Sequence, residues 1–190
     1  MRALLVAAAL LAAQAAPAPN PLFVDRTAAL GLTPGNEQAC WVDLDNDRWP
    51  DLVASGTVWR NRDGRTFERV ADLGLCVAAD FDNDGFTDLF SWSSRTLHRN
   101  VAGKRFEPFP LPPLPDAVSR GACWADGDAD GFVDLVVGGY EDWDRGLTCR
   151  TCFLRNDAGK GFTLAFTDAR FRARGIAACD FDRDGRPEVY

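Results

Sequence analysis

The sequence predicts an all-β protein, a β-propeller of four-stranded antiparallel blades that is incomplete in this chain, with about three blades plus parts of two others. Three observations support this prediction. A nine-residue acidic motif occurs four times along the chain. Each of the first three copies is followed by the same succession of an apolar run, an Arg-Asn pair, a glycine and a phenylalanine. No segment beyond the N-terminal leader shows a sustained helical period of apolar residues, which indicates that the repeated unit is built from strands.

The acidic motif begins as Asp-x-Asp-x-Asp and ends with an acid at its ninth position. Its four copies occupy residues 43–51, 80–88, 126–134 and 180–188. Their first aspartates are 37, 46 and 54 residues apart, a spacing close to the length of a propeller blade. A constant motif at a variable spacing indicates one structural unit whose connecting loops tolerate insertions.

The similarity between units extends beyond the motif. The shared Arg-Asn pairs are Arg60-Asn61, Arg99-Asn100 and Arg155-Asn156. The glycine and phenylalanine that follow are Gly64 and Phe67, Gly103 and Phe106, and Gly159 and Phe162. Each unit therefore reads as strand, acidic loop, strand, turn, strand, glycine turn and strand.

The N-terminus predicts an export signal. Met1-Arg2 precedes an apolar run, and the small residues at 13–15 provide a cleavage site, so residues 1–15 are expected to be a signal peptide. Residues 16–22 would be a short linker to a propeller portion at 23–190. The apolar run of about 11 residues is well short of the roughly 20 that span a bilayer as a helix. We therefore expect a secreted or periplasmic/extracellular protein without a membrane span.

Both ends of the propeller portion suggest an open array of blades. The segment Phe23–Leu32 resembles Phe67–Leu75, near the end of the first unit, and this similarity predicts an outer strand whose own blade is completed elsewhere. The chain stops immediately after the fourth acidic loop, which leads us to expect a fragment or a truncated product. The proline-rich segment Phe109–Pro115 is expected to be a stiff connector between the second and third units.

The acidic loops predict bound calcium. Four carboxylates within nine residues repel one another, and a hard cation would neutralise them. Side-chain oxygens at positions 1, 3, 5 and 9, with a backbone carbonyl at position 7, suit Ca²⁺. The predicted side-chain ligands are Asp43, Asp45, Asp47 and Asp51; Asp80, Asp82, Asp84 and Asp88; Asp126, Asp128, Asp130 and Asp134; and Asp180, Asp182, Asp184 and Glu188. The predicted carbonyl ligands are those of Trp49, Phe86, Phe132 and Arg186.

Position 6 of the loops adds a conformational signature. It is Gly85, Gly131 and Gly185 in three loops, as expected where the backbone turns with a positive φ. The first loop has Arg48 there, which costs about 1 kcal/mol in that conformation, so we expect the first site to bind most weakly. With four acids each, the loops hold sixteen of the 28 acidic residues, and four Ca²⁺ ions would bring the charge close to zero.

Other interpretations of these loops are weaker. An EF-hand needs a glutamate at position 12 and flanking helices, whereas position 12 is Ala54, Ser91 and Val137 in the first three loops and the flanks are strands. Magnesium prefers to retain its waters instead of entering an all-protein cage. Solvated acidic turns without any ion remain the alternative, although four copies in register argue against it.

The six cysteines fit an exported protein. We expect Cys149 and Cys152 to form a disulfide, because they lie together in a stretch that lengthens one repeat. A zinc site there would need a second pair of ligands, and the only histidine belongs to another unit. Cys40, Cys123 and Cys179 precede acidic loops on a predicted buried face and are expected to be small apolar fillers.

The remaining residues offer little for catalysis. With 21 basic against 28 acidic residues, nucleic acid and anionic membranes are improbable partners. His98 aligns with Trp59 and Leu154 of the other units, so it reads as an ordinary strand residue, and no nucleophilic triad can be assembled around it. We therefore expect no enzymatic activity. Tyr140 and Trp143, in the long excursion of the third unit, are candidates for a partner-binding patch.

The loops and the phenylalanine-glycine spacing resemble the FG-GAP/VCBS repeats of integrin α-subunit propellers and of many secreted bacterial proteins. The opening from Phe23 to Asp43 also resembles the ASPIC/UnbV (cartilage acidic protein-like) group. These resemblances imply calcium bound within each blade and a role in adhesion or in contact with carbohydrate or protein. The expected function is therefore a secreted calcium-binding scaffold with an extracellular protein or carbohydrate ligand. The alternative is the non-catalytic propeller portion of a secreted enzyme such as a polysaccharide lyase.

Overall fold

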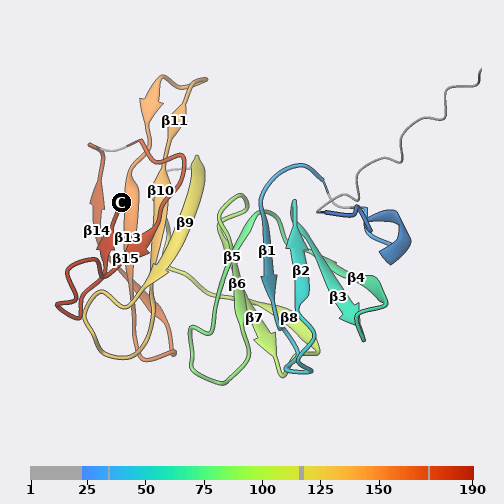
Figure 1. Cartoon of the computed structure of the whole chain (residues 1–190). Coiled ribbons are helices and arrows are strands. Elements are labelled where there is room, and N and C mark those ends of the chain that lie inside the picture. Colours follow the sequence, from blue (N-terminus) through green and yellow to red (C-terminus); the bar gives the residue numbers. More distant parts are fainter. Residues whose placement is uncertain (1–22, 34, 116–117, 171) are drawn as a thin grey trace, which may run out of the picture.

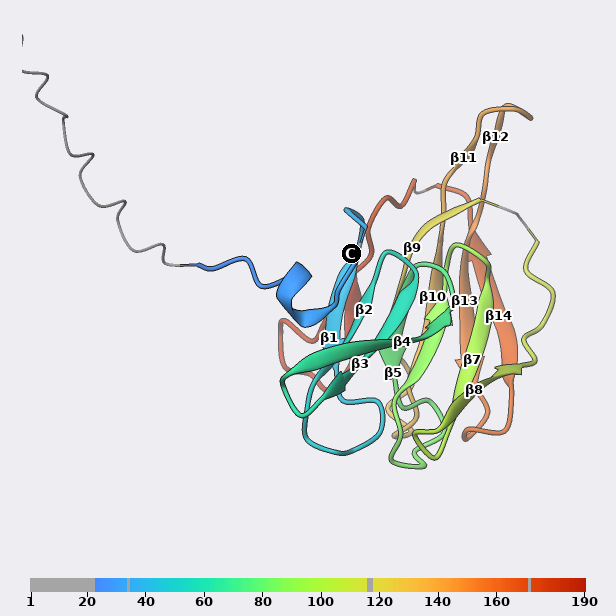
Figure 2. The same cartoon turned by 90° about the vertical axis from the view of Figure 1, so that its right-hand side faces the viewer.

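The computed structural model describes residues 23–33, 35–115, 118–170 and 172–190. Three four-stranded antiparallel sheets follow one another along the chain and stand side by side (Figures 1 and 2), so the prediction of incomplete propeller blades is confirmed. The expected signal peptide at 1–15 and linker at 16–22 lie outside the described residues. Within those residues, no helix has the length and hydropathy needed to cross a membrane.

Each complete blade has its four strands in chain order across the sheet. The first blade contains β1 (Ala39–Val42), β2 (Asp51–Ala54), β3 (Thr57–Arg62) and β4 (Thr66–Asp72). The second contains β5 (Cys76–Ala79), β6 (Asp88–Ser91), β7 (Thr96–Val101) and β8 (Arg105–Phe109). The third contains β9 (Ser119–Ala125), β10 (Asp134–Gly139), β13 (Thr151–Asn156) and β14 (Phe162–Asp168). A fourth unit is represented by β15 (Ala178–Cys179) and β16 (Glu188–Val189).

The long excursion of the third unit forms a separate hairpin. It consists of β11 (Glu141–Asp142) and β12 (Leu147–Thr148), inserted between β10 and β13. In Figures 1 and 2 this hairpin projects beyond the end of the third blade. It therefore lies at the end of β10 that pairs with the beginning of β9.

The second strand of each blade is the most buried. All four residues of β2 and all four of β6 are buried, which agrees with the short apolar runs that follow the acidic loops. The first strands β1, β5, β9 and β15 line a common cavity of about 680 Å³, which is the axial channel of the open array. Every acidic loop connects one of these innermost strands to the second strand of its own unit.

Hydrophobic cores fill the interfaces between blades. Leu44 and Phe81, at position 2 of the first and second loops, are fully buried against the blade that follows each of them. Phe81 contacts Phe162 of the third blade, with ring centroids 5.6 Å apart. The equivalent Phe181 of the fourth unit is 75% exposed. Position 2 therefore anchors the first and second blades to the blades that follow them. The third loop has Gly127 at this position, and the fourth unit has no described neighbour to receive Phe181.

The predicted outer strand at Phe23–Leu32 is wrong. The segment forms a 3-10 turn, η1 (Ala28–Leu30), that ends at Gly31 with a φ of 75°. The Asp25 carboxylate accepts a hydrogen bond from the Thr27 N–H, which favours a turn over an extended chain. Leu32 is buried against the first blade, so the segment caps that blade without adding a strand to it.

The proline-rich connector and the cysteines also differ in part from expectation. Leu111 and Leu114 of the connector pack against the core between the second and third blades, so this segment has a packing role as well as a spacing role. None of the six cysteines, all of which are described, forms a disulfide. Cys149 and Cys152 are both buried, and Cys152 belongs to the same core. The expected Cys149–Cys152 pair is therefore not formed.

The three cysteines before the acidic loops behave differently from one another. Cys123 is buried and Cys40 is partly buried against the core between the first and second blades, as expected of small fillers. Cys179 is exposed, because the fourth unit has only two strands and nothing described covers this face.

Candidate metal centres

The carboxylates of each acidic loop accept hydrogen bonds from backbone N–H groups of the same loop and so stabilise its conformation. In the second loop, Asp80 accepts hydrogen bonds from the N–H groups of Asp84 (3.1 Å) and Gly85 (2.9 Å). Asp84 in turn accepts one from the N–H of Phe86 (2.9 Å). The third and fourth loops repeat all three bonds. The first loop keeps the bonds from Arg48 to Asp43 and from Trp49 to Asp47. The predicted position-7 residues thus enter this network through their N–H groups.

Two positions in each loop adopt the left-handed conformation. At position 6, Arg48 has a φ of 74° and the three glycines have φ values of 89° to 91°, as the sequence predicts. At position 4, all four residues also have a positive φ, between 55° and 63°. The repeat pattern alone did not predict this second position. The signal was Asn46 and Asn83, because asparagine tolerates the left-handed region better than most residues do.

The position-9 carboxylate joins its loop to the third strand of the same unit. Asp88 is fully buried and accepts hydrogen bonds from the N–H groups of Phe81 (3.1 Å) and Asn100 (2.7 Å). Asp51 and Asp134 receive the same two bonds from the corresponding residues of their own units. The motif predicted these acids only as ligands of the cation, and their structural role was not predicted.

Burial makes the position-9 carboxylates electrostatically costly. Desolvation raises the pKa of Asp88 to about 7, although the two N–H bonds oppose the shift. Desolvation raises the pKa values of Asp51 and Asp134 in the same direction, and that of Asp82 at position 3 as well. A divalent cation close to these groups would favour their charged forms.

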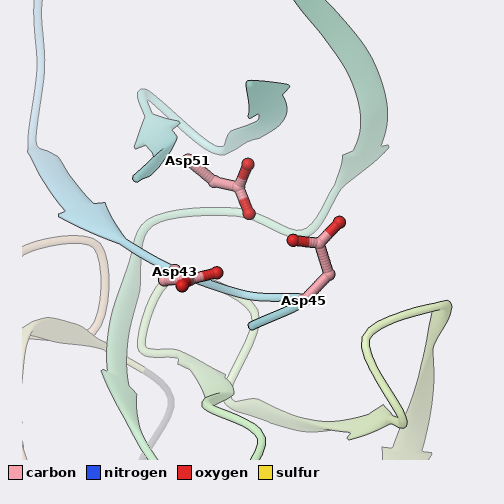
Figure 3. Close-up of side chains that lie close together, drawn as sticks. All are labelled: Asp43, Asp45 and Asp51. Atoms are coloured by element: carbon pink, nitrogen blue, oxygen red, sulfur yellow. The ribbon is translucent and has the colours of Figure 1, made fainter. Parts of the chain in front are cut away.

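Three acids of each loop converge on one point. The groups are Asp43, Asp45 and Asp51; Asp80, Asp82 and Asp88; Asp126, Asp128 and Asp130; and Asp180, Asp182 and Glu188. In each group, one oxygen per residue lies within 4.8 Å of those of the others. Figure 3 shows the first group, in which the side chains face one another from the end of β1, the loop and the start of β2.

The remaining predicted side chains stand apart from these groups. Position 5 is outside the group in the first, second and fourth loops, where Asp47, Asp84 and Asp184 hold the position-7 N–H. In the third loop the outlying acid is Asp134, at position 9. The predicted ligands are thus brought close together within each loop, but only three per loop meet at a common point.

The first two groups contain buried oxygens without partners. Asp43 Oδ1, Asp45 Oδ1 and Asp82 Oδ1 are inaccessible to solvent and accept no hydrogen bond from the described residues. A buried carboxylate oxygen without a partner is unfavourable unless a cation lies against it. These oxygens therefore fit a hard divalent cation. The third and fourth groups are more open, because Asp128, Asp130 and Asp182 are exposed.

Arginines from the Arg-Asn pairs partly neutralise the loops. Arg60 lies 3.2 Å from Asp45, and Arg99 lies 2.7 Å from Asp82. Both contacts involve the position-3 aspartate of the same unit. The arginine thus offsets one charge of the loop and leaves the other carboxylates to a cation. The sequence shows these pairs as part of the repeat, but it did not predict this role of the arginine.

The asparagines of the same pairs connect each loop to the following blade. The amide of Asn100 donates hydrogen bonds to the carbonyls of Leu44 (2.7 Å), in the preceding loop, and Thr87 (3.0 Å), in its own. Asn156 repeats the arrangement with Phe81 (2.8 Å) and Val133 (2.9 Å). Among the described residues, the amide of Asn61 donates only within its own unit, to the carbonyl of Pro50.

The glycine turns of the repeat fit under the preceding loop. A Cβ added at Gly103 would lie 2.7 Å from the Cα of Asp45, and one added at Gly159 would lie 2.8 Å from the Cα of Asp82. Each of these glycines also has its N–H bound by the asparagine of its own unit. The position-3 aspartate is therefore supported directly by the next blade.

Successive loops are also joined to each other. The amide of Asn46 donates to the carbonyl of Gly85 (2.8 Å), and that of Asn83 donates to the carbonyl of Gly131 (3.0 Å). In both cases a position-4 asparagine reaches position 6 of the next loop. The third loop has Ala129 at position 4, and alanine has no side-chain amide that could donate such a bond. In the part of the chain that the structure describes, these hydrogen bonds therefore link the first loop to the second and the second to the third, but not the third to the fourth.

The fold and these sites define a class of protein, a repeat protein whose propeller blades each carry an acidic loop at the end of the innermost strand. Residues 80–137 match the family model of the FG-GAP-like repeat, so the recognition of FG-GAP repeats is confirmed. The match covers the second loop, the last three strands of the second blade, and β9, the third loop and most of β10 in the third unit.

A solved structure supports the same fold. It is described as a lectin of Agrocybe aegerita that recognises non-reducing terminal N-acetylglucosamine, and it matches with a TM-score of 0.51 at 19% sequence identity. The match covers 80% of this chain and 46% of the lectin chain, so the protein spans about half the length of that relative. No curated protein sequence matches the chain significantly.

Proposed function

We propose that this chain is an exported binding module of a β-propeller, in which calcium stabilises the blades and the ligand is a carbohydrate or a protein. The observation that carries the calcium assignment is the set of buried oxygens without partners on Asp43, Asp45 and Asp82. Each lies in a group of three converging carboxylates, and a hard cation is the partner that such a group requires.

The residues that would hold calcium are the predicted ligands of the four loops. The three converging acids of each loop form the base of the site. The fourth acid and the position-7 carbonyl would bring the number of protein groups to five, and bidentate carboxylates or water would complete a shell of six to eight oxygens. The open third and fourth loops would bind with the affinity of extracellular sites, for which dissociation constants of about 10⁻⁴ to 10⁻³ M are typical.

The proposed role of the ion is structural because its ligands lie at blade interfaces. The backbone of Asp45 rests against Gly103, and that of Asp82 rests against Gly159. An ion that fixes the position-3 aspartate would also fix the surface on which the next blade docks. Calcium bound to the folded state and absent from the unfolded state stabilises the protein by mass action.

We propose binding and not catalysis for this chain. His98 lies on β7 opposite Leu89, and burial lowers the pKa of its imidazole. The equivalent positions in the other units are Trp59 and Leu154, opposite Leu52 and Leu135. Its position is thus that of a strand residue in a repeated blade. The carboxylates of the acidic loops are proposed to bind calcium, so they are not assigned a catalytic role.

A carbohydrate ligand is supported by the likeness in fold to the N-acetylglucosamine-binding lectin. The net charge of −7 disfavours nucleic acid and anionic membranes as partners. Export is supported by the apolar N-terminal run and its small-residue cleavage site. An extracellular location would also supply calcium at the millimolar concentration that such loops need.

Thermal melting with and without calcium tests the proposal. At 10 mM Ca²⁺, each site with the expected affinity adds about 1.5–3 kcal/mol to the free energy of unfolding, so the melting temperature should rise on calcium addition and fall on chelation. Magnesium at the same concentration should have a much smaller effect. A folded sample with the same melting temperature in calcium and in chelator would overturn the proposal.

Matched variants locate the effect. Asp82→Asn should reduce the number of calcium ions bound per chain by one, as measured by calorimetry, while Asp80 and the third and fourth loops remain intact. Glu107→Gln is the control, because Glu107 is an exposed acid on β8 outside the loops. It should leave calcium stoichiometry unchanged.

A further inference from the structure

A pocket away from the acidic loops is lined by Arg120, Tyr140, Trp143 and Arg174. We call it the arginine pocket; its volume is about 320 Å³. Arg120 is at the start of β9, whereas the third acidic loop begins after the end of this strand, at Asp126. The pocket and the candidate metal centre of the third unit are thus separated by the length of β9. The hairpin of β11 and β12, which projects in Figures 1 and 2, carries Trp143 in its turn.

The floor of the arginine pocket is Tyr140, which is only 8% exposed. The Nε–H of Arg174 donates a hydrogen bond to the Tyr140 hydroxyl (2.7 Å), and the Arg174 guanidinium lies 5.0 Å from the centre of the ring. The Arg120 guanidinium lies 5.9 Å from the same centre. One buried aromatic ring therefore positions two cationic side chains.

The segment that carries Arg174 is fixed to the third blade. The Ala173 N–H donates to the Gly139 carbonyl (3.0 Å), at the end of β10. Arg172 forms an ion pair with the buried Glu141 of the hairpin. A Cβ added at Gly121 would lie 3.4 Å from the Cα of Gly175. These contacts hold Arg174 against the pocket, so the site is preorganised rather than assembled from mobile surface side chains.

The pocket carries positive charge in an acidic protein. None of its four lining residues is an acid, although the chain has a net charge of −7. Arg120 and Arg174 have no carboxylate partner among the described residues. Of the three acids of the hairpin, Glu141 pairs with Arg172 and Asp142 pairs with Arg145, whereas Asp144 is exposed and does not line the pocket. Two guanidinium groups without a carboxylate partner favour an anionic ligand, and a planar carboxylate matches their geometry.

Trp143 adds a surface of a different kind. Its indole is 73% exposed, yet it lines the same pocket as the two arginines. Exposed aromatic rings at a site provide a rigid apolar face against which a ligand ring can pack. A ligand that satisfies both features has a flat apolar face and a carboxylate close to it. A sugar ring with a carboxylate substituent has both.

We propose that the arginine pocket binds a carboxylate-bearing saccharide, with the sugar ring against Trp143 and the carboxylate between Arg120 and Arg174. This assignment rests on the proposed function as a binding module and names the ligand class. It places the ligand at the opposite end of β9 from the proposed calcium site, so binding requires no direct contact between the sugar and the ion.

Titration calorimetry of the full chain at constant ionic strength tests the assignment. The probes are a glucuronic acid oligosaccharide, its neutral glucose counterpart and sodium sulfate. The acidic oligosaccharide should bind at least about tenfold more tightly than the neutral one, because charged hydrogen bonds to a carboxylate are lost with the latter. Sulfate alone should bind more weakly than the acidic sugar, because it offers no ring to Trp143.

Variants of the pocket separate its two parts. Arg120→Gln and Arg174→Gln should each weaken binding of the acidic oligosaccharide about tenfold or more, and Trp143→Ala should weaken the binding of both sugars. The controls are Arg65→Gln, an exposed arginine in the first blade, and Trp41→Ala, an indole on β1 that is 61% exposed. Both controls should leave the affinity unchanged.

Three results would overturn the assignment: equal affinity for acidic and neutral sugars, equal affinity in the pocket variants and the wild type, or binding of sulfate as tight as that of the acidic sugar. Calcium-dependent melting of the same samples is a separate readout. Stabilisation by calcium without saccharide binding would reject the pocket assignment alone. Saccharide binding without an effect of calcium would reject the structural role of the ion and leave the pocket assignment standing.

Discussion

At the scale of single residues, the asparagine of each Arg-Asn pair links more of the structure than any loop aspartate does. Asn100 is 1% exposed, and its amide bonds two carbonyls that lie in different units. Its Oδ1 accepts the N–H of Gly103, and its own N–H is held by Asp88. A buried side chain with this many satisfied hydrogen bonds cannot be shortened without leaving several backbone groups unpaired.

Replacement of Asn100 by alanine should therefore be strongly destabilising. The carbonyls of Leu44 and Thr87 and the N–H of Gly103 would lose their partner, so we expect a loss of about 2–4 kcal/mol in the free energy of unfolding. Chemical denaturation in calcium-containing buffer measures this loss.

Asn61→Ala is the matched control for that variant. Asn61 is also buried, but its amide bonds only the carbonyl of Pro50, within its own unit. Its replacement should cost about 1 kcal/mol less than that of Asn100. Equal losses for the two variants would show that the bond to the preceding loop contributes nothing to stability.

Residue types were the predictable part of the site, and long-range contacts were not. The spacing of the aspartates and the glycines at position 6 were sufficient to place the four loops. The bond from Asn100 to Leu44 joins residues 56 apart in sequence, and that from Asn156 to Phe81 joins residues 75 apart. Such contacts depend on how one blade docks on another, which a motif within a single unit does not encode.

At the scale of the elements, the acidic loops form a linked row. Asn46 binds the second loop and Asn83 binds the third, each through the carbonyl of a position-6 glycine. That glycine is the residue whose positive φ shapes the receiving loop. An ion bound in one loop would thus restrict the backbone of its neighbour, and calcium binding to the first three loops is expected to be cooperative.

The third loop offers a test of these hydrogen bonds between loops. Ala129 has a φ of 60° at the position that is asparagine in the first two loops. Ala129→Asn should supply the missing amide for the carbonyl of Gly185 and stabilise the fourth loop by about 0.5–1.5 kcal/mol. Amide hydrogen exchange of residues 180–189 measures the gain as slower exchange.

Ala129→Gly distinguishes the effect of the added hydrogen bond between loops from the effect of the backbone conformation. Glycine adopts a positive φ more easily than alanine but provides no donor. If the hydrogen bond between the loops forms, the asparagine variant should protect the fourth loop from amide hydrogen exchange more than the glycine variant does. Equal protection in the two variants would attribute the whole effect to backbone conformation.

The element that sequence analysis assigned wrongly has a local physical reason. The segment at 23–32 shares its apolar residues with Phe67–Leu75, but it also contains an Asp25-to-Thr27 turn and a left-handed Gly31. The similarity captured the residues that pack on the blade, and Leu32 is indeed buried. It did not capture the turn, because the same apolar positions can be presented by a 3-10 turn or by a strand.

At the scale of the whole molecule, the blades form one array held by interface cores. Cys76 is at the core between the first and second blades, next to Leu44 of the first loop. Burial raises the pKa of its thiol to about 12, and that of Cys123 to about 11. At pH 8 both thiols are protonated and shielded, and therefore unreactive. Their reactivity reports whether the interfaces are closed.

Alkylation with iodoacetamide at pH 8 should therefore depend on calcium. With calcium present, the exposed Cys179 should react readily, whereas Cys76 and Cys123 should react at least about a hundredfold more slowly, because they react only through opening of the array. Chelation should accelerate the labelling of Cys76, since its core adjoins the first loop. Mass spectrometry of tryptic peptides follows each site. Unchanged labelling of Cys76 after chelation would separate calcium from the docking of these blades.

In the third unit, the acidic loop lies at one end of β9, and Arg120 and Arg174 line a pocket at the other end. Before any ion binds, a polyanion that approaches this pocket would be attracted by the two arginines, but it would also meet the repulsion of a chain with a net charge of −7. Divalent ions at the acidic end would remove much of that repulsion. The association rate of an acidic polymer would then rise with calcium, although the polymer and the ions make no direct contact.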